Sequence, residues 1–142
     1  MPLWKIYHPV NAYSPEDKDA FAEKVTEIYA RFMPRFYVNI IFEAVAEDSF
    51  YVGGKRKNNF VRIAMEHIAR EFPNEEASIR FINKISQVIS PWVKDRSFDW
   101  EFHIDETPFS LWSVQGYFPP RQGTEDEKRW IAENRPSPRT HD

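Results

Sequence analysis

The sequence predicts an α/β fold built from two fused β-α-β units, with a four-stranded sheet, two helices and a short C-terminal helix. Two observations predict it. Residues 2–49 contain a strand, a helix and a strand in that order, and residues 59–106 repeat the order roughly 60 residues later. The chain has 142 residues and is 42% hydrophobic, enough for one core without disulfide or metal support. We therefore expect one domain over residues 1–142, with residues 107–142 as a C-terminal extension.

The first unit opens with a strand at residues 3–8, whose side chains alternate between two faces. The segment Ser14-Pro15-Glu16-Asp17 supplies an N-cap, a proline at the first helical position and an acid three residues after the serine. A helix should begin there and end near Pro34. Residues 36–45 are rich in β-branched and aromatic types, so they predict a largely buried strand. A crossover of this kind normally leaves its two strands parallel.

The second unit repeats these signals. A short extended piece, Phe50-Tyr51-Val52, leads through two glycines into a turn-rich loop. A strand at residues 60–68 follows, then a helix that begins near Pro73-Asn74 and ends near Pro91, then a strand at residues 99–104.

The C-terminal extension is less regular. Thr124-Glu125-Asp126-Glu127 is a capping box and predicts a short helix. After Arg135 the tail is rich in proline, serine and arginine, and we expect it to be mobile.

Composition excludes several classes of function. The net charge of −3 and a single basic cluster, Lys55-Arg56-Lys57, argue against nucleic acid as a partner. The absence of cysteine excludes disulfides, thiolate nucleophiles and sulfur-ligated zinc. No stretch approaches the roughly 20 apolar residues of a membrane span. We expect a cytoplasmic protein with no membrane partner.

The amino terminus carries the most specific chemistry. Removal of Met1 would leave Pro2 with a free secondary amine at the start of a strand. Burial beside cationic side chains lowers the pKa of an amine, so this amine could act as a general base at neutral pH. The alternative is that Pro2 is an ordinary first residue of a strand, a position that proline tolerates. A retained methionine would make the Pro2 nitrogen an amide without basicity.

Taken together, these features resemble the tautomerase superfamily, whose catalytic group is an N-terminal proline. The resemblance is to the branch of cis-3-chloroacrylic acid dehalogenase and to oxalocrotonate-tautomerase-like proteins, and it covers residues 2 to about 135. It rests on the order and spacing of Pro2, Tyr51-Val52-Gly53-Gly54, His67-Ile68-Ala69-Arg70, and the segment from Trp100-Glu101-Phe102-His103 through Gly116-Tyr117-Phe118-Pro119.

The resemblance implies a homotrimer with a cofactor-independent active site near Pro2 and a small α-keto or enol carboxylate as substrate. Arg70 falls on the second of the family's two carboxylate-binding arginines, and His67 falls on the first. Histidine cannot grip a carboxylate bidentately as arginine does, so carboxylate affinity should be altered. Arg62, on the same strand, could compensate.

Other family positions are also changed. The substrate-binding histidine of the helix corresponds to Tyr29, and the tyrosine of the late strand corresponds to Phe102, or to His103 if the insertion is placed earlier. The water-activating glutamate corresponds to Val114, with Gln115 beside it. Water attack would therefore lack its base, so keto-enol tautomerisation by Pro2 is favoured over dehalogenation or hydration.

Each candidate has a structural alternative. Arg70 could be a surface ion-pair partner, the two histidines could be structural, and Tyr29 and Phe102 could simply pack in the core. A metal site on His103, Asp105, His67 and Glu66 has only generic spacing, so we expect no metal. Gly53-Gly54-Lys55 lacks the full phosphate-loop pattern. The competing hypothesis is that the protein is not an enzyme but a trimeric binding module that has the same fold and has lost catalysis.

Overall fold

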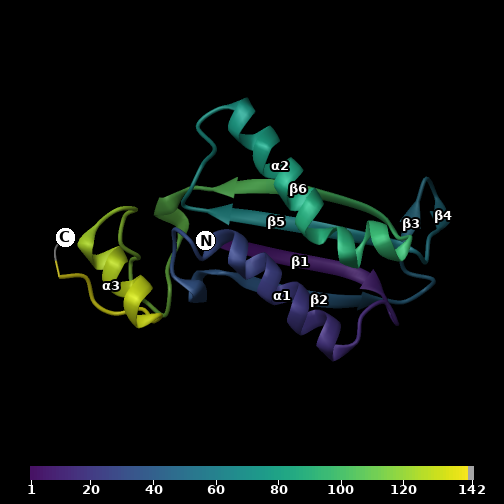
Figure 1. Ribbon diagram of the computed structural model, residues 1–142, viewed down its shortest axis with the longest axis horizontal. Helices are drawn as coiled ribbons and strands as arrows, with labels where there is room; N and C mark the ends of the chain where they lie inside the picture. Colours follow the sequence, from purple (N-terminus) through teal and green to yellow (C-terminus); the bar gives the residue numbers. More distant parts are fainter. Residues whose placement is uncertain (141–142) are drawn as a thin grey trace.

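Two β-α-β units meet along the centre of one sheet in the computed structural model, which describes residues 1–140 (Figure 1). The first unit contains β1 (Pro2–Pro9), α1 (Pro15–Tyr29) and β2 (Asn39–Val45). The second contains β5 (Phe60–Ile68), α2 (Glu75–Ile89) and β6 (Asp99–Thr107). A small hairpin of β3 (Tyr51–Val52) and β4 (Lys55–Arg56) joins the two units, and α3 (Glu125–Glu133) lies in the C-terminal extension.

The strand order in the four-stranded sheet is β2-β1-β5-β6. Within each unit the two strands are parallel, as a β-α-β crossover requires, and the units join by antiparallel pairing of β1 with β5. Ile6 pairs with Ile63 at the middle of this central pair, and Pro2 pairs with His67 at one end. The predicted α/β fold of two fused units is therefore confirmed.

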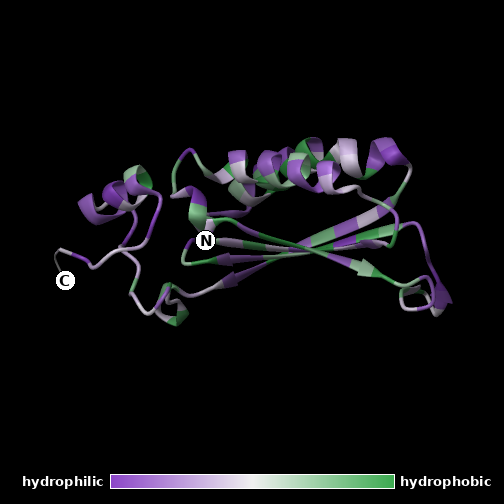
Figure 2. Cartoon of the chain, turned by 90° about the horizontal axis from the view of Figure 1, so that it is seen from below, coloured by the Kyte–Doolittle hydropathy of each residue, from purple (hydrophilic) through white to green (hydrophobic). Residues whose placement is uncertain are grey.

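Both long helices cover the same face of the sheet (Figure 2). Alternate residues of the two central strands point into this layer, and five of them, Trp4, Ile6, Val61, Ile63 and Met65, are completely buried. Each such side chain contributes roughly 1.5–3 kcal/mol by leaving water. The period-2 pattern of the central strands thus defines the core.

Local signals place the helix starts where the sequence predicts them. The Ser14 hydroxyl accepts a hydrogen bond from the Asp17 amide at 3.0 Å, and the Asp17 carboxylate accepts one from the Ser14 amide at 3.0 Å. In α2, the Asn74 side chain accepts from the Ala77 amide at 2.9 Å. Each cap satisfies backbone N–H groups that have no partner within the helix.

Three boundaries differ from the sequence prediction. The first helix ends at Tyr29 and does not continue to near Pro34. Arg35–Tyr37 forms a 3₁₀ turn, so the second strand begins only at Asn39. The late strand extends to Thr107 because it pairs along its whole length with β5.

The prediction of a mobile tail is wrong for residues 136–140. Arg129 of α3 donates to the Ser137 hydroxyl at 3.3 Å and to the Pro138 carbonyl at 2.7 Å. The Asp126 carboxylate accepts from the Thr140 hydroxyl at 2.7 Å. These bonds hold residues 137–140 against α3. The final residues, 141–142, lie outside the described residues.

The opposite face of the sheet has no helix on it. It carries apolar side chains such as Leu3 and Ile41, the latter 46% exposed, together with the 3.2 Å ion pair between Lys5 and Glu66. Within residues 1–140, none of the helices is both long and apolar enough to cross a membrane.

We predict that Ile63→Ala destabilises the protein by about 2–5 kcal/mol, because it leaves a cavity at the centre of the β1–β5 pair. Urea denaturation at neutral pH measures this loss. Ile79→Ala is the matched control, since Ile79 lies on α2 and is 52% exposed. It should change the free energy of unfolding by less than about 0.5 kcal/mol. Equal losses in the two variants would contradict the assignment of the core.

Candidate active site

A cavity of about 230 Å³ opens at the end of the sheet where β1 begins. It brings together four of the residues that the sequence singled out: Pro2, Tyr29, His67 and Arg70. The remaining lining is mostly apolar and includes Met1, Phe32, Met33, Ile68, Phe72 and Phe81, with Glu71 and Gln122. A mainly apolar cleft with a few convergent polar groups is the usual form of a small-molecule site.

The N-terminus is held against the end of β5. The Met1 amine donates a hydrogen bond to the Ile68 carbonyl, and the Ile68 amide donates to the Met1 carbonyl at 2.7 Å. Burial, and secondly the positive charge of Arg70, lower the pKa of this amine to about 5, while Glu127 acts in the opposite direction. An amine at this point of the fold is therefore largely neutral at pH 7.

A chain of three side chains links the helix layer to the cavity. The Trp4 indole donates to the Tyr29 oxygen at 3.1 Å, and the Tyr29 hydroxyl lies 2.8 Å from His67 Nε2. Burial holds the pKa of Tyr29 well above its usual range, so its hydroxyl stays protonated and donates to the histidine. Burial, and then the N-terminal charge, lower the pKa of His67 to about 4. His67 is therefore neutral at pH 7, with its proton on Nδ1.

Arg70 reaches the cavity from the loop that follows β5. Ala69, just before it, has a φ of 72°, a left-handed conformation that turns the chain away from the strand. The guanidinium donates to the Phe32 carbonyl at 3.0 Å and to the Glu127 carboxylate at 2.8 Å. Arg70 is thus an internal ion-pair partner whose side chain is only 19% exposed.

Glu127 is the residue of this region that the sequence reasoning missed. The capping box at Thr124 marked it as a helix-start residue, and nothing in the local pattern connects it with Arg70. Its side chain is 7% exposed and belongs to α3, which lies off the same end of the sheet as the N-terminus in Figure 1. Its buried ion pair is visible only once the chain is folded.

Phe102 and His103 do not lie with the other four candidates. Phe102 faces the helix layer and stacks on Trp100, with ring centroids 6.0 Å apart. His103 is on the opposite face of the sheet, where its Nδ1 accepts from Arg62 at 2.7 Å. Arg62 pairs with Tyr7, five residues along β1 from Pro2, and lies on the same face as His103, so it does not supply the second arginine within the chain.

Val114 is also outside the residues that line the cavity. Two backbone hydrogen bonds of 3.0 and 2.9 Å join it to Tyr117 around a tight turn. Gln115 and Gly116 occupy this turn with φ values of 50° and 84°. Val114 packs against the core and offers no polar group.

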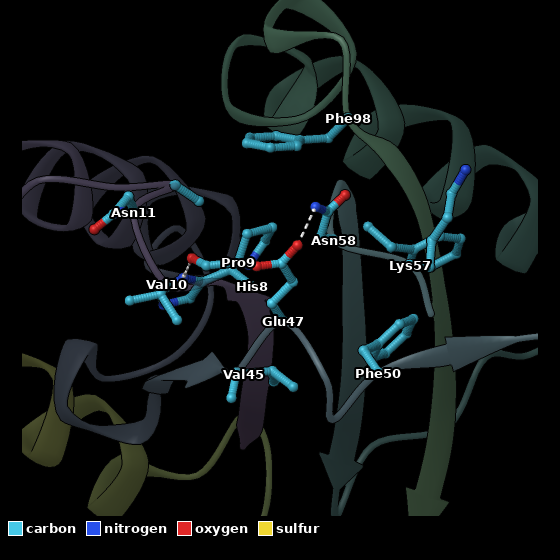
Figure 3. Close-up of a pocket in the computed structure, with 13 residues that line it drawn as sticks. His8, Pro9, Val10, Asn11, Val45, Glu47, Phe50, Lys57, Asn58 and Phe98 are labelled. Atoms are coloured by element: carbon cyan, nitrogen blue, oxygen red, sulfur yellow. Dashed lines mark hydrogen bonds between the residues drawn. The ribbon is translucent and has the colours of Figure 1, made fainter. Parts of the chain in front are cut away.

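A second cavity, of about 390 Å³, lies at the opposite end of the sheet (Figure 3). Some of its polar side chains engage other protein groups: Asn58 donates to Glu47 at 3.2 Å, and Lys57 pairs with Asp99 at 2.8 Å. His8 also lines it, and its buried Nε2 has no partner within residues 1–140. This second cavity lacks the N-terminal amine, so the smaller cavity is the better candidate. Across residues 1–140, no group of three or more His, Cys, Asp or Glu side chains is arranged to hold a metal ion.

Comparison with known proteins agrees with this geometry. The family model described as "Putative oxalocrotonate tautomerase enzyme" matches residues 1–135. The chain belongs to this family. It is therefore a member of the tautomerase superfamily, as the resemblance implied.

Solved structures of similar proteins support the assignment. Native RhCC from Rhodococcus jostii RHA1 is 43% identical, with a TM-score of 0.94 over 96% of this chain and 99% of that chain. A probable enzyme from the thermophilic fungus Aspergillus fumigatus is 36% identical, with a TM-score of 0.91 over 96% of each chain. N1, of the cis-3-chloroacrylic acid dehalogenase family, is 17% identical and shares the fold, with a TM-score of 0.70 over 92% of this chain and 90% of that chain. No curated protein matches the chain.

We predict that His67 of this tautomerase-family protein stays neutral down to about pH 4. Its folded pKa lies below the ordinary value of 6.5, so the unfolded chain binds the proton more readily. The stabilisation is complete above pH 6.5 and is lost as the pH falls toward 4. The free energy of unfolding, measured in urea, should therefore fall less between pH 7 and pH 5 for His67→Asn than for the wild type.

His103→Asn is the matched control, because His103 is exposed and lies on the other face of the sheet. The free energy of unfolding of His103→Asn should fall between pH 7 and pH 5 by as much as that of the wild type. NMR titration of the imidazole provides a direct reading, and a His67 midpoint near 6.5 would contradict the prediction.

Proposed function

We propose that this protein is a cofactor-independent isomerase that interconverts the enol and keto forms of a small carboxylate, with Pro2 as general base after Met1 is removed. The observation that carries the proposal is the position of the N-terminus in a mainly apolar cavity, where burial lowers the pKa of the Met1 amine to about 5. Pro2 is the next residue, begins β1 and lines the same cavity, so its free amine would be buried in the same surroundings. An amine that is neutral at pH 7 can accept a proton, whereas an ammonium ion cannot.

In the proposed reaction, the Pro2 amine takes the hydroxyl proton of the enol and a proton is returned to carbon, so the proton count is conserved. Arg70 binds the substrate carboxylate through guanidinium N–H groups that Phe32 and Glu127 leave unused. The His67 Nδ1–H and the Tyr29 hydroxyl supply polar contacts near the developing negative charge. The apolar remainder of the cavity limits access of water.

Dehalogenation or hydration is the weaker alternative, because position 114 carries valine and lies outside the cavity lining. A silent binding module would apply if Met1 is retained, since the Pro2 nitrogen would then be an amide. We leave Phe102 and His103 out of the proposed site, because neither lines this cavity.

The first test is ketonisation of phenylenolpyruvate by protein whose Met1 removal has been verified by mass spectrometry. Protein that retains Met1 should show a kcat/KM lower by about 100-fold or more, because its Pro2 nitrogen is an amide and general-base catalysis contributes roughly 10²–10⁴. Tyr29→Phe is the comparison variant, since it removes one hydroxyl and leaves the amine in place. It should retain measurable turnover. Absence of wild-type turnover above buffer would overturn the proposed function.

We also propose that the protein is a homotrimer, in which other copies cover the open face of the sheet. That face carries Leu3, Tyr7 and the exposed Ile41 without a helix above them. Trimers are described for fused 4-OT proteins that share the fold, such as the F6 fused 4-OT asymmetric trimer, with a TM-score of 0.64 and 17% identity over 81% of this chain and 94% of that chain.

Light scattering should therefore give three times the chain mass of 17.0 kDa. Ile41→Glu should dissociate the assembly, because it places a charge in the covered face. Ile79→Glu, on the exposed side of α2, should leave the mass unchanged. A monomeric wild type would contradict the trimer.

A further inference from the structure

We propose that Glu127 is a positioning residue of the active site, through which the C-terminal extension orients Arg70 and places a negative charge beside the N-terminal amine. This inference rests on the proposed function, because orientation of Arg70 matters when it binds a substrate carboxylate. It assigns the extension a role in the site in addition to its role in packing.

The Glu127 carboxylate is held on both oxygens. Oε2 accepts from Arg70 at 2.8 Å, and Oε1 accepts from the Gly123 amide at 3.2 Å. The Glu127 amide in turn donates to the Thr124 hydroxyl at 3.3 Å. These bonds fix the carboxylate to the first turn of α3, so the position of Arg70 depends on the position of this helix.

The Arg70 guanidinium is held between segments that are far apart in the sequence. Its other end donates to the Phe32 carbonyl in the turn after α1 at 3.0 Å, and the Phe32 ring lies 5.5 Å from the guanidinium carbon. An arginine restrained in this way loses less rotational freedom when a carboxylate binds. Glu127 therefore holds the Arg70 guanidinium in a fixed orientation before the substrate carboxylate binds.

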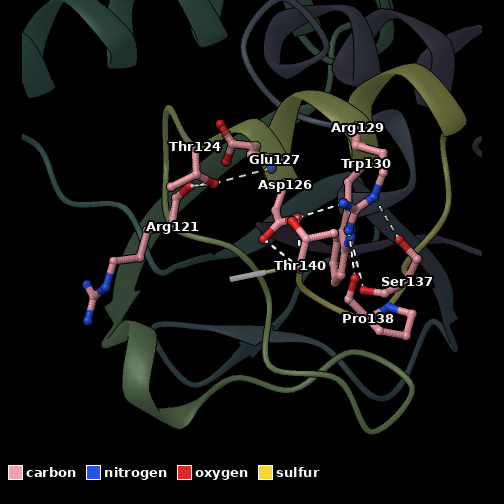
Figure 4. A network of polar contacts seen from close by, with 9 residues as sticks. All are labelled: Arg121, Thr124, Asp126, Glu127, Arg129, Trp130, Ser137, Pro138 and Thr140. Atoms are coloured by element: carbon pink, nitrogen blue, oxygen red, sulfur yellow. Dashed lines mark hydrogen bonds and ion pairs between the residues drawn. The ribbon is translucent and has the colours of Figure 1, made fainter. Parts of the chain in front are cut away.

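The ion pair is buried, with side chains 19% and 7% exposed. Burial of two charges costs free energy unless good geometry and further hydrogen bonds compensate for it, so such a pair is a poor device for stability alone. The neighbouring Asp126 and Arg129 already attach the tail to α3 (Figure 4). Glu127 takes no part in those bonds, and its partner belongs to the Pro2 cavity.

A small cavity of about 20 Å³ connects Glu127 with the N-terminus. Met1, Tyr37, Arg70 and Glu127 all line it. Tyr37 is 2% exposed, and its hydroxyl has no partner within residues 1–140. Burial, and then the Glu127 carboxylate, hold the pKa of Tyr37 well above its usual range. The Glu127 carboxylate therefore lines the same small cavity as Met1 and helps to raise the pKa of Tyr37 there.

Several charged or titratable groups surround the amine. Arg70 follows β5, neutral His67 lies on β5, and Tyr29 ends α1. Tyr37 precedes β2, Glu71 lines the Pro2 cavity, and Glu127 comes from α3. Among these groups, Arg70 lowers the pKa of the N-terminal amine and Glu127 raises it. Neutralising Glu127 should therefore lower the pKa of the Pro2 amine.

Two variants of the Met1-processed protein separate charge from position. Glu127→Gln keeps the length of the side chain and removes its charge, so the acid limb of the kcat/KM profile should move to lower pH with little change in the plateau. Glu127→Asp keeps the charge but shortens the side chain, so the acid limb should stay and kcat/KM should fall by about 10- to 100-fold through misplacement of Arg70. Asp126→Asn is the matched control, since it lies on the same turn and does not contact Arg70.

A readout independent of turnover is the NMR titration of the ¹⁵N-labelled Pro2 amine. Its midpoint should fall in Glu127→Gln and stay at the wild-type value in Asp126→Asn. Binding of phenylpyruvate, followed by tryptophan fluorescence, should weaken in Glu127→Asp. If the wild type turns over no substrate, these two measurements still decide the role of Glu127. An unmoved Pro2 midpoint in Glu127→Gln, or equal losses in Asp126→Asn, would overturn it.

Discussion

The antiparallel pairing of β1 with β5 is the constraint on which the rest of the molecule depends. It joins two parallel β-α-β units into one sheet and fixes the register that pairs Pro2 with His67. The same register points Trp4, Ile6, Ile63 and Met65 into one helix-covered layer. Because side chains alternate strictly along a strand, a slip of one residue would send both the core and His67 to the other face.

The chemistry of the cavity follows from its place at one end of this central pair. Strand ends normally meet water, but here the loop after β5, the turn after α1 and the C-terminal extension enclose the N-terminus. Burial is the largest influence on the Met1 amine, on Tyr29 and on His67, and it favours the neutral form of each. The charged side chains at this end of the sheet include the Arg70 and Glu127 pair and the exposed Glu71. A neutral base beside a fixed cation suits proton transfer on a bound carboxylate.

The C-terminal extension has two separate polar networks on one short helix. Asp126 binds Arg129 and Thr140 and holds the tail (Figure 4), whereas the next residue, Glu127, forms an ion pair with Arg70. Adjacent helix residues point about 100° apart, so one turn can face the tail and the body of the protein at once. This division allows the extension to be attached firmly while one of its side chains reaches the site.

The sequence alone determined the two β-α-β units, their helix caps and the candidacy of Pro2, because period-2 alternation, capping residues and an N-terminal proline are local signals. It also grouped Tyr29, His67 and Arg70 by resemblance, and the fold places these three beside Pro2. It did not separate them from Phe102 and His103, since the register between neighbouring strands decides both the face and the end of the sheet at which a residue lies. Phe102 pairs with Ile63, four residues away from His67, and His103 lies on the other face. Only the tertiary structure decided that His103 lies behind the sheet and that Glu127 pairs with Arg70. Contacts between residues 57 positions apart leave no periodic trace in the sequence, because they depend on how the whole chain closes around the N-terminus.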